Sequence, residues 1–294
     1  MAKFTMIIGI PGSGKSTVAK KMTDQNTVYL SSDELRLKMF DDENEQGRNS
    51  ELFGYMLSET KKALVNGKDV IYDATNINAK RRTGLLKQLP KGAYKRAVMV
   101  MAPFHICVER NGSRDRKVPE DKIKMFYETF TPAWYGEGWD EIEVIRNYDT
   151  VLYPEDSSLT LILESAKGVD HDNPHHHRFI YEHMRAMYEA ALANNEDDLV
   201  CLACLYHDIG KPSTKVFTNA KGEPSEIAHF YRHENVGAYM ALCDPNCPLE
   251  LAVLIAYHMR FFNKNGNFSK LEAIIGPNLH EKLKAVYAYD VAYD

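Results

Sequence analysis

The stretch Gly9-Ile10-Pro11-Gly12-Ser13-Gly14-Lys15-Ser16-Thr17 constrains the fold of this chain more than any other feature. It follows an apolar run at residues 4–8 and precedes a helix-forming segment, which predicts the order strand, glycine-rich loop, helix. From Gly9 to Ser16 it matches the pattern G-x-x-x-x-G-K-[ST], whose backbone N–H groups and helix N-terminus hold phosphate oxygens. The sequence therefore predicts a site for a nucleoside triphosphate. The alternative is a glycine turn that binds no nucleotide.

Each position of this loop has an expected role. Glycines let the backbone wrap around a phosphate without a Cβ in the way. We expect Lys15 to reach the β- and γ-phosphates and the hydroxyl of Ser16 to ligate Mg²⁺. The predicted nucleotide-binding residues of the loop are Gly12, Ser13, Gly14, Lys15, Ser16 and Thr17.

Length and charge predict two domains. A chain of 294 residues is long for one domain. Residues 1–150 carry 24 Lys and Arg against 21 Asp and Glu, whereas residues 151–294 carry 12 against 20. Ten of the eleven histidines lie after residue 170, so the two halves suggest different chemistries. The net charge of −5 argues against a general nucleic-acid coat, but not against an enzyme that grips a few phosphates.

The sequence also bears on where the chain works. No apolar run approaches the length of a membrane span, and the N-terminus lacks the regions of a signal peptide. Five cysteines, an odd number, favour a reducing compartment. We therefore expect a cytoplasmic protein that does not use a membrane, while its oligomeric state stays open.

Short apolar runs alternate with helical stretches through the first half. The predicted strands cover residues 4–8, 27–30, 70–72, 97–101 and 142–145, and residues 51–66 form a helix that Gly67 would cap. Such alternation predicts an α/β domain with a parallel sheet and helices on both faces. Ligands of such sheets bind at the carboxyl ends of the strands.

Polar residues follow two of these strands. Asp33 comes after residues 27–30, where an acceptor would approach the γ-phosphate, and a carboxylate there could act as a general base. Arg36 would lie on the same helix face and could clamp a substrate phosphate. A helix N-cap followed by an exposed arginine explains these residues equally well. Asp73 ends the next strand, where it would lie near Mg²⁺ or orient Arg36.

Two basic segments complete the first half. Arg110 and Arg114, one helical turn apart, lie on a segment that could close over the glycine-rich loop and neutralise charge on a transferred phosphoryl group. Three arginines within residues 110–116 favour this role over a plain surface helix. The triplet Lys80-Arg81-Arg82 is more simply explained as the solvated start of a helix.

The segments GIPGSGKS, SSDELR, DATNIN with RR just after, and ERNGSR together resemble the kinase domain of phage-type polynucleotide 5′-kinases. They occur in that order over about residues 1–146. The resemblance implies ATP-dependent phosphorylation of a 5′-hydroxyl on RNA or DNA. It implies catalytic roles for Lys15, Asp33 and Arg114, with Asp33 as the general base. Arg110 and Arg114 would form a lid that also binds ATP.

The same resemblance implies an acceptor site made of Arg36, Asp73 and Asn76. Arg36 would bind the 3′-phosphate of the acceptor nucleotide, and Asp73 would support that site. Other P-loop kinases with small acceptors share the loop and the lid. The pair Asp33 and Arg36 is the more specific part of the match.

The second half reads differently. Residues 159–165 form a short apolar helix or strand and residues 167–174 are polar, so we predict a first domain at 1–150, a linker region at 151–174 and a second domain at 175–294. Apolar residues recur at helical spacing over 179–192, 198–206, 235–243, 249–259 and 279–293, which predicts an all-α bundle.

His207 and Asp208 stand side by side at the end of one predicted helix, where both could ligate one metal ion. His183 precedes them, and His229, His233, His258 and Asp290 follow. Imidazole and carboxylate together suit Mn, Fe, Co, Ni or Zn rather than Ca. A lone histidine is usually structural, but several around a His-Asp dipeptide indicate a metal site.

Residues 175–294 resemble the HD-domain phosphohydrolases. The resemblance implies a metal-binding set of His183, His207, Asp208 and Asp290, with His233 and His258 for a second metal. It also implies that Lys211 is catalytic and holds a substrate phosphate. For His175, His176 and His177 we favour local hydrogen bonds or outer positions over ligation. The cysteines at 201 and 204, and at 243 and 247, could suggest zinc, but core cysteines explain the first pair better.

The two resemblances together imply a two-domain enzyme that repairs nucleic-acid ends. The first part would phosphorylate 5′-OH ends with ATP and Mg²⁺, and the second would remove a 2′,3′-cyclic phosphate or 3′-phosphate with Mn²⁺, Co²⁺, Ni²⁺ or Zn²⁺. An RNA or DNA ligase could act downstream. Two alternatives remain: a nucleoside or metabolite kinase fused to a nucleotidase, and a regulator that ATP switches. The sequence does not decide between RNA and DNA.

Overall fold

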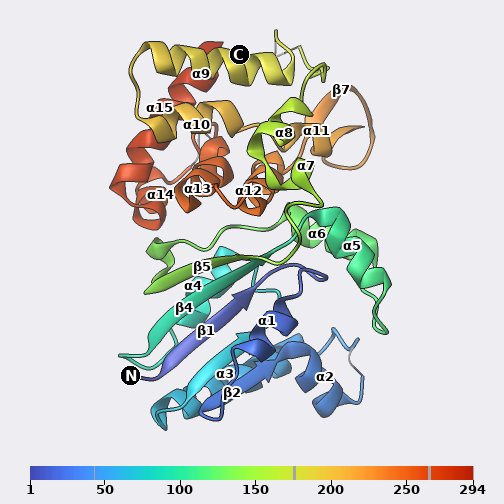
Figure 1. The fold of residues 1–294 in the computed structure, drawn as a ribbon, viewed down its shortest axis with the longest axis vertical. Helices are drawn as coiled ribbons and strands as arrows, with labels where there is room; N and C mark the ends of the chain where they lie inside the picture. Colours follow the sequence, from blue (N-terminus) through green and yellow to red (C-terminus); the bar gives the residue numbers. More distant parts are fainter. Residues whose placement is uncertain (43, 175–176, 264–265, 294) are drawn as a thin grey trace. The chain divides into compact units, whose positions relative to one another are not determined.

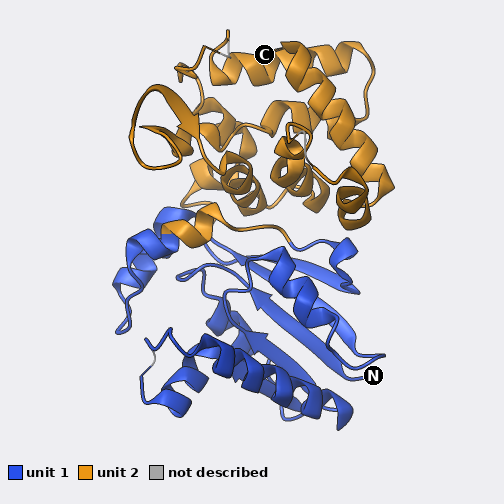
Figure 2. Ribbon diagram, turned by 180° about the vertical axis from the view of Figure 1, so that it is seen from behind, with its two compact units in different colours: residues 1–123, 133–148 blue, residues 124–132, 149–294 orange. Residues whose placement is uncertain are grey.

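The chain forms two compact units, drawn in separate colours in Figure 2. The computed structural model describes all residues except 43, 175–176, 264–265 and 294. The first unit comprises residues 1–123 and 133–148, and the second comprises residues 124–132 and 149–294. None of the described helices combines the length and the apolar composition that a membrane crossing requires.

A five-stranded parallel sheet forms the centre of the first unit (Figure 1). Its strands are β1 (Lys3–Ile8), β2 (Thr27–Ser31), β3 (Asp69–Asp73), β4 (Tyr94–Met101) and β5 (Glu141–Arg146), in the spatial order β2-β3-β1-β4-β5. Every pairing is parallel, which confirms the predicted sheet. Residues 4–8 of the central strand are buried at consecutive positions, as expected for a strand covered on both faces.

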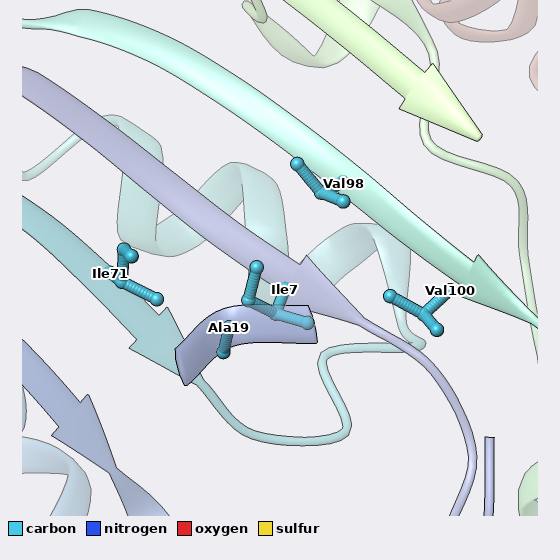
Figure 3. Packing of buried hydrophobic residues seen from close by; sticks show 5 residues of the cluster. All are labelled: Ile7, Ala19, Ile71, Val98 and Val100. Atoms are coloured by element: carbon cyan, nitrogen blue, oxygen red, sulfur yellow. The ribbon is translucent and has the colours of Figure 1, made fainter. Parts of the chain in front are cut away.

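Helices alternate with these strands. They are α1 (Lys15–Lys21), α2 (Ser32–Phe40), α3 (Asn49–Val65), α4 (Ala79–Leu86) and α5 (Phe104–Gly112), and α6 (Glu120–Glu128) begins in this unit and ends in the second. Figure 3 shows how Ala19 of α1 meets Ile7, Ile71, Val98 and Val100 of the three central strands. This packing fixes α1 against β1 and thereby fixes the loop that joins them. The C-cap of α3 is Asn66, and Gly67, which was predicted to cap the helix, follows it in the left-handed region with φ +74°.

One basic residue of the first unit is not on the surface. Lys80 and Arg81 are exposed, but Arg82 is 1% exposed. Its guanidinium donates to both carboxylate oxygens of Glu137, at 2.8 and 2.6 Å, and the indole of Trp139 donates to the same carboxylate at 3.0 Å. The interpretation of the whole triplet as a solvated helix start is therefore wrong for Arg82.

The second unit is mainly helical, as predicted. Its principal helices are α9 (Ile180–Ala193), α10 (Asp198–Tyr206), α12 (His233–Cys243), α13 (Leu249–Tyr257) and α15 (Pro277–Tyr293), with shorter helices α7 (Pro154–Ser157), α8 (Leu159–Glu164), α11 (Lys211–Thr214) and α14 (Phe268–Ile275). Residues 251–257 of α13 are all buried, so this helix lies in the core of the second unit. Both α7 and α8 lie in the region predicted as a linker, and α8 buries Leu159, Ile162 and Leu163.

One element departs from the predicted all-α bundle. Strands β6 (Lys215–Thr218) and β7 (Pro224–Phe230) form an antiparallel hairpin whose turn contains Gly222 at φ +81°. With four residues, β6 is too short for an alternating pattern to stand out from a loop. The hairpin ends three residues before His233, one of the predicted metal-binding residues.

The five cysteines are all free and buried. Cys201 and Cys204 lie on α10 among other buried residues, which confirms that they are core cysteines.

Candidate active sites

The glycine-rich loop lies between β1 and α1, and its conformation needs glycine. Gly12 and Gly14 both have φ +85°, in the left-handed region. A Cβ on Gly12 would lie 2.1 Å from the carbonyl oxygen of Cys107. Lys15 is 8% exposed at the start of α1, and Ser16 and Thr17 follow in its first turn. The predicted nucleotide-binding residues of the loop therefore lie together at the carboxyl end of β1.

Replacing Gly12 with alanine should weaken nucleotide binding. The left-handed backbone alone costs a residue with a Cβ about 1–2 kcal/mol, and the contact with Cys107 forces the loop to shift. Titration with a fluorescent ATP analogue, together with thermal unfolding, measures both effects. The control is Gly54→Ala, since a Cβ there meets nothing within 4 Å and α3 should gain stability. Equal nucleotide affinity in both variants would contradict the loop's role.

A residue that sequence reasoning missed holds this loop in place. The side-chain amide of Asn147 donates to the carbonyl oxygen of Ser13 at 2.8 Å. Its backbone N–H donates to Met101 at 2.8 Å, which extends the pairing of β4 and β5. Only its position in the sequence could have indicated a role for Asn147, because it follows the carboxyl end of a strand in a parallel sheet, where ligands bind.

Asp33 and Arg36 lie on the first turns of α2. Ser31 caps this helix by accepting the backbone N–H of Glu34 at 3.3 Å, so the N-cap interpretation is confirmed. Arg36, however, is 5% exposed rather than a surface arginine. One guanidinium nitrogen lies 3.5 Å from Asp33, and another donates to Asn49 at 2.7 Å.

The arginine-rich segment contacts Asp33 through Arg116, which was not among the predicted site residues. Nη1 of Arg116 lies 2.6 Å from Oδ1 of Asp33, and its Nε donates to Asn44 at 3.2 Å. Burial raises the pKa of Asp33, but the hydrogen bond from Arg116 and the charge of Lys15 lower it more. The net pKa lies below the ordinary aspartate value, so this carboxylate is ionised at neutral pH.

The two predicted lid arginines are less alike than their spacing suggests. Arg110 is half-buried on α5, and that helix ends at Gly112. Arg114 lies beyond the helix end and is exposed. They therefore do not form one face of a single helix, because the chain turns away between them.

The remaining acceptor residues follow β3. Asp73 is 2% exposed and accepts a hydrogen bond from the hydroxyl of Tyr29 at 2.8 Å, while its other oxygen has no hydrogen-bond partner among the described residues. Asn76 has φ +50° and donates to the carbonyl of Ile7 at 2.8 Å. Its amide group thus ties the loop after β3 to β1, and its contact with an acceptor stays a prediction.

In the second unit, the predicted metal-binding residues lie in two adjoining groups that share Asp208: His183 and His207 on one side, and His233 and His258 on the other. In the first group, His183 lies on α9 and His207 lies at the end of α10. In the second group, His233 begins α12 and His258 begins a 3₁₀ turn, His258–Arg260. One carboxylate oxygen of Asp208 lies 3.2 Å from Nε2 of His207, and the other lies 3.2 Å from Nε2 of His233.

Asp290 of α15 completes the first group. Its Oδ1 lies 3.2 Å from Nε2 of His183 and 3.7 Å from Nε2 of His207. Asp290 is 8% exposed, and the histidines of both groups are buried. The sequence predicted all of these residues, and the structure brings them together from segments that lie up to 107 residues apart.

Backbone carbonyls orient the four histidine rings. Nδ1 of each ring faces a carbonyl oxygen, at 3.3 Å for His183, 3.0 Å for His207, 2.7 Å for His233 and 2.8 Å for His258. A carbonyl only accepts, so Nδ1 carries the proton and the lone pair of the neutral ring is on Nε2. Two such nitrogens face each other at 3.3 Å in the first group and at 3.1 Å in the second. Histidines that ligate metals are held in this way.

The charges in this cluster also fit divalent metals. Burial raises the pKa of Asp208, but His207 and Lys211 lower it well below the usual range. Burial likewise raises the pKa of Asp290, and the histidines His207 and His183 lower it to about 2. The two oxygens of Asp208 face imidazole nitrogens of His207 and His233 and the ammonium of Lys211. Buried carboxylate oxygens among imidazole lone pairs match the preferences of transition metals.

Other histidines have different surroundings. Nε2 of His229 lies 3.2 Å from the hydroxyl of Ser225, and its ring stacks on Tyr231. His177 is exposed, whereas His175 and His176 lie outside the described residues. Nζ of Lys211 lies 2.6 Å from Oδ2 of Asp208 and 3.2 Å from Nε2 of His171. His171 falls in the region that the sequence analysis predicted to be a linker.

Comparison with known proteins agrees with this division. Residues 4–133 match the family model described as AAA domain, and residues 180–289 match the HD domain. L-seryl-tRNA(Sec) kinase of Methanococcus maripaludis is 32% identical over 147 residues, which is 46% of this chain and 55% of that protein. A protein of Acanthamoeba polyphaga mimivirus named as a bifunctional polynucleotide phosphatase/kinase is 27% identical over 153 residues, or 49% of this chain and 33% of that protein.

The chain thus spans about half and a third of the length of these two relatives. Among solved structures, a chain of the Pnkp1/Rnl/Hen1 RNA repair complex is 24% identical, with a TM-score of 0.39 over 42% of each chain. The glycine-rich loop lies within the first of these matches, and the predicted metal-binding residues other than Asp290 lie within the second. Residues 4–133 are thus similar to the AAA domain, and residues 180–289 are similar to the HD domain.

Proposed function

We propose that this chain heals broken nucleic-acid ends by two reactions: ATP-dependent phosphorylation of a 5′-OH, and removal of a 2′,3′-cyclic phosphate or 3′-phosphate. The observation that carries the proposal is the presence in one chain of a glycine-rich loop whose Lys15 acts on the ionised Asp33, and of two buried groups of His and Asp that could hold metal ions. Ribonuclease cleavage leaves a 5′-OH and a cyclic phosphate, whereas a ligase needs the opposite pair. One chain with both activities would prepare both ends.

We assign the kinase to residues 1–150. The loop N–H groups and Lys15 would bind the phosphates of ATP, and Ser16 would ligate Mg²⁺. Asp33 would accept the proton of the attacking hydroxyl, and Arg110 and Arg114 would offset the charge of the transferred phosphoryl group. Arg116 already pairs with Asp33, so we place it beside these residues in the acceptor site.

We assign phosphoester hydrolysis to residues 175–294, with residues 151–174 between the two domains. His183, His207, Asp208 and Asp290 would hold one metal, and Asp208, His233 and His258 a second. Bound transition metals such as Mn²⁺, Co²⁺, Ni²⁺ or Zn²⁺ would polarise the phosphoryl group and lower the pKa of water. Lys211 would bind a phosphate oxygen beside them.

The names of the two relatives support a nucleic-acid substrate. One is a kinase of an aminoacyl-tRNA, and the other is named for both kinase and phosphatase activity on polynucleotides. RNA is therefore the substrate we would test before DNA, with a ligase as the partner that would act on the healed ends.

The test supplies the purified protein with an RNA that carries 5′-OH and 2′,3′-cyclic phosphate ends, ATP and a panel of divalent metals, and resolves both ends of the product. We expect a 5′-phosphate and loss of the cyclic phosphate. Phosphorylation of free nucleosides in preference to RNA would instead support a small-molecule kinase. ATP turnover without a phosphorylated acceptor would support a regulatory protein.

Arg36→Ala should slow the phosphorylation of acceptors that carry a 3′-phosphate more than that of acceptors that lack it. A charge-assisted contact with that phosphate predicts about a tenfold or larger loss with oligonucleotides and 3′-mononucleotides, and a much smaller loss with nucleosides that lack it. Labelling from γ-³²P-ATP with paired acceptors measures the ratio. The control is Arg48→Ala, which removes an exposed arginine paired with Glu51. An equal loss with every acceptor would show that Arg36 is structural.

A further inference from the structure

His171 is buried beside the HD-domain cluster although it precedes the predicted domain. It is 0% exposed, and its ring lies 6.0 Å from that of His183 and 5.8 Å from that of Phe230. Its neighbours therefore include a proposed metal ligand, and sequence spacing gave no reason to expect this.

The hydrogen bonds of His171 differ from those of the proposed ligands. Its Nδ1 lies 2.7 Å from the carbonyl oxygen of Arg178, so Nδ1 carries the proton and Nε2 carries the lone pair. That Nε2 lies 3.2 Å from the ammonium nitrogen of Lys211. The lone pair therefore faces a cation, whereas the corresponding lone pairs of the proposed ligands face one another.

Lys211 is held between defined neighbours. Its Nζ lies 2.6 Å from Oδ2 of Asp208 and 5.4 Å from the centre of the Phe230 ring, and the residue is 6% exposed. An ammonium has three N–H donors on a flexible four-carbon stem. Asp208 and His171 accept two of them, which leaves one direction in which a phosphate oxygen can be bound.

We propose that His171 is a positioning residue that fixes the ammonium of Lys211 for phosphate binding. The inference rests on the proposed function of the HD domain, but it concerns this chain's own hydrogen bonds. Without the acceptor at Nε2, the ammonium would turn toward Asp208 and lose its defined direction. His171 would touch neither metal nor substrate, so it would act only through Lys211.

The test compares His171→Asn with His171→Gln. The asparagine amide can keep the donor to Arg178 but cannot reach Lys211, whereas the longer glutamine can offer Lys211 an oxygen. Isothermal titration of the Mn²⁺-loaded protein with inorganic phosphate gives the affinity, and metal analysis gives the stoichiometry. We expect about tenfold weaker phosphate binding in His171→Asn, partial rescue in His171→Gln, and full metal content in both.

A double-mutant cycle with Lys211→Ala decides the mechanism. If His171 acts through Lys211, His171→Asn should have no further effect on phosphate affinity in the Lys211→Ala background. His280→Asn is the matched control, because His280 is 4% exposed in the same unit and lies beside Phe261. It should leave phosphate affinity unchanged. If His171→Asn fails to fold in thermal unfolding, His171→Phe, which keeps the ring volume, takes its place in the cycle.

Three results would overturn the inference: additive effects in the cycle, loss of bound metal with His171→Asn, or equal phosphate affinity in wild type and both His171 variants. Failure of the proposed function looks different. Wild-type protein that binds phosphate but does not act on RNA ends would refute end healing and leave the phosphate cycle valid.

Discussion

Asp208→Asn should abolish phosphoester hydrolysis and leave the kinase active. Both oxygens of Asp208 lie 3.2 Å from imidazole nitrogens of different groups, so the carboxylate would serve both metals. The amide keeps the shape but removes the charge. Since bound metals are worth several kcal/mol to such reactions, we expect a loss of about 10³-fold or more. Hydrolysis of cyclic phosphate, kinase rate and metal content, measured on one preparation, check this.

Asp244→Asn is the matched control. Asp244 is a buried carboxylate of the same unit, and it accepts the backbone N–H of Leu159 at 2.8 Å. Loss of this carboxylate should lower the stability of the protein but leave hydrolysis unchanged at a temperature where the protein stays folded.

Removal of metal with EDTA should stop hydrolysis, and Mn²⁺, Co²⁺ or Ni²⁺ should restore it better than Mg²⁺. Equal loss of kinase and hydrolase activity in folded Asp208→Asn would refute two separate sites.

The strands and most helices could be predicted because their signals are local. Residues 4–8 are apolar at consecutive positions and end at a glycine-rich loop, so strand β1 and the start of α1 follow directly. The prediction for 198–206 coincides with α10, since an acidic N-cap precedes a continuous apolar run. The short hairpin of β6 and β7 was missed because its pairing, rather than its sequence pattern, defines it.

The site residues divide in the same way. A motif with fixed spacing indicated the loop, and the resemblance to the HD-domain phosphohydrolases indicated the predicted metal-binding residues. Contacts between distant segments gave no such signal. Arg82 and Glu137 are 55 residues apart, and His171 and Lys211 are 40 apart. In each pair, the tertiary fold determines which residue lies beside the other. The sequence alone shows only a basic or polar residue that could contact many others.

Asp33→Asn should lose kinase activity while ATP still binds. A positioned general base contributes about 10²–10⁴-fold, and Asp33 would touch the acceptor rather than the nucleotide. Lys15→Ala should also abolish the reaction, but by weakening the contacts with phosphate. Labelling from γ-³²P-ATP gives the rates, and binding of a fluorescent ATP analogue separates the two variants. Hydrolysis of cyclic phosphate should be unchanged in both.

Glu34→Gln is the control for Asp33→Asn, since Glu34 is the adjacent carboxylate and pairs instead with Lys20 at 2.8 Å. Glu34→Gln should keep the kinase rate of the wild type.

The pH dependence of the kinase supplies a second check on Asp33. The pKa of Asp33 lies below its ordinary value because Arg116 and Lys15 outweigh its burial. Asp33 thus stays ionised as pH falls from neutrality toward that ordinary value, so its protonation should not slow the kinase there. A near-normal rate in Asp33→Asn would remove the general base from the mechanism. The pair of Asp33 with Arg116 would then serve only to hold the arginine-rich segment against α2.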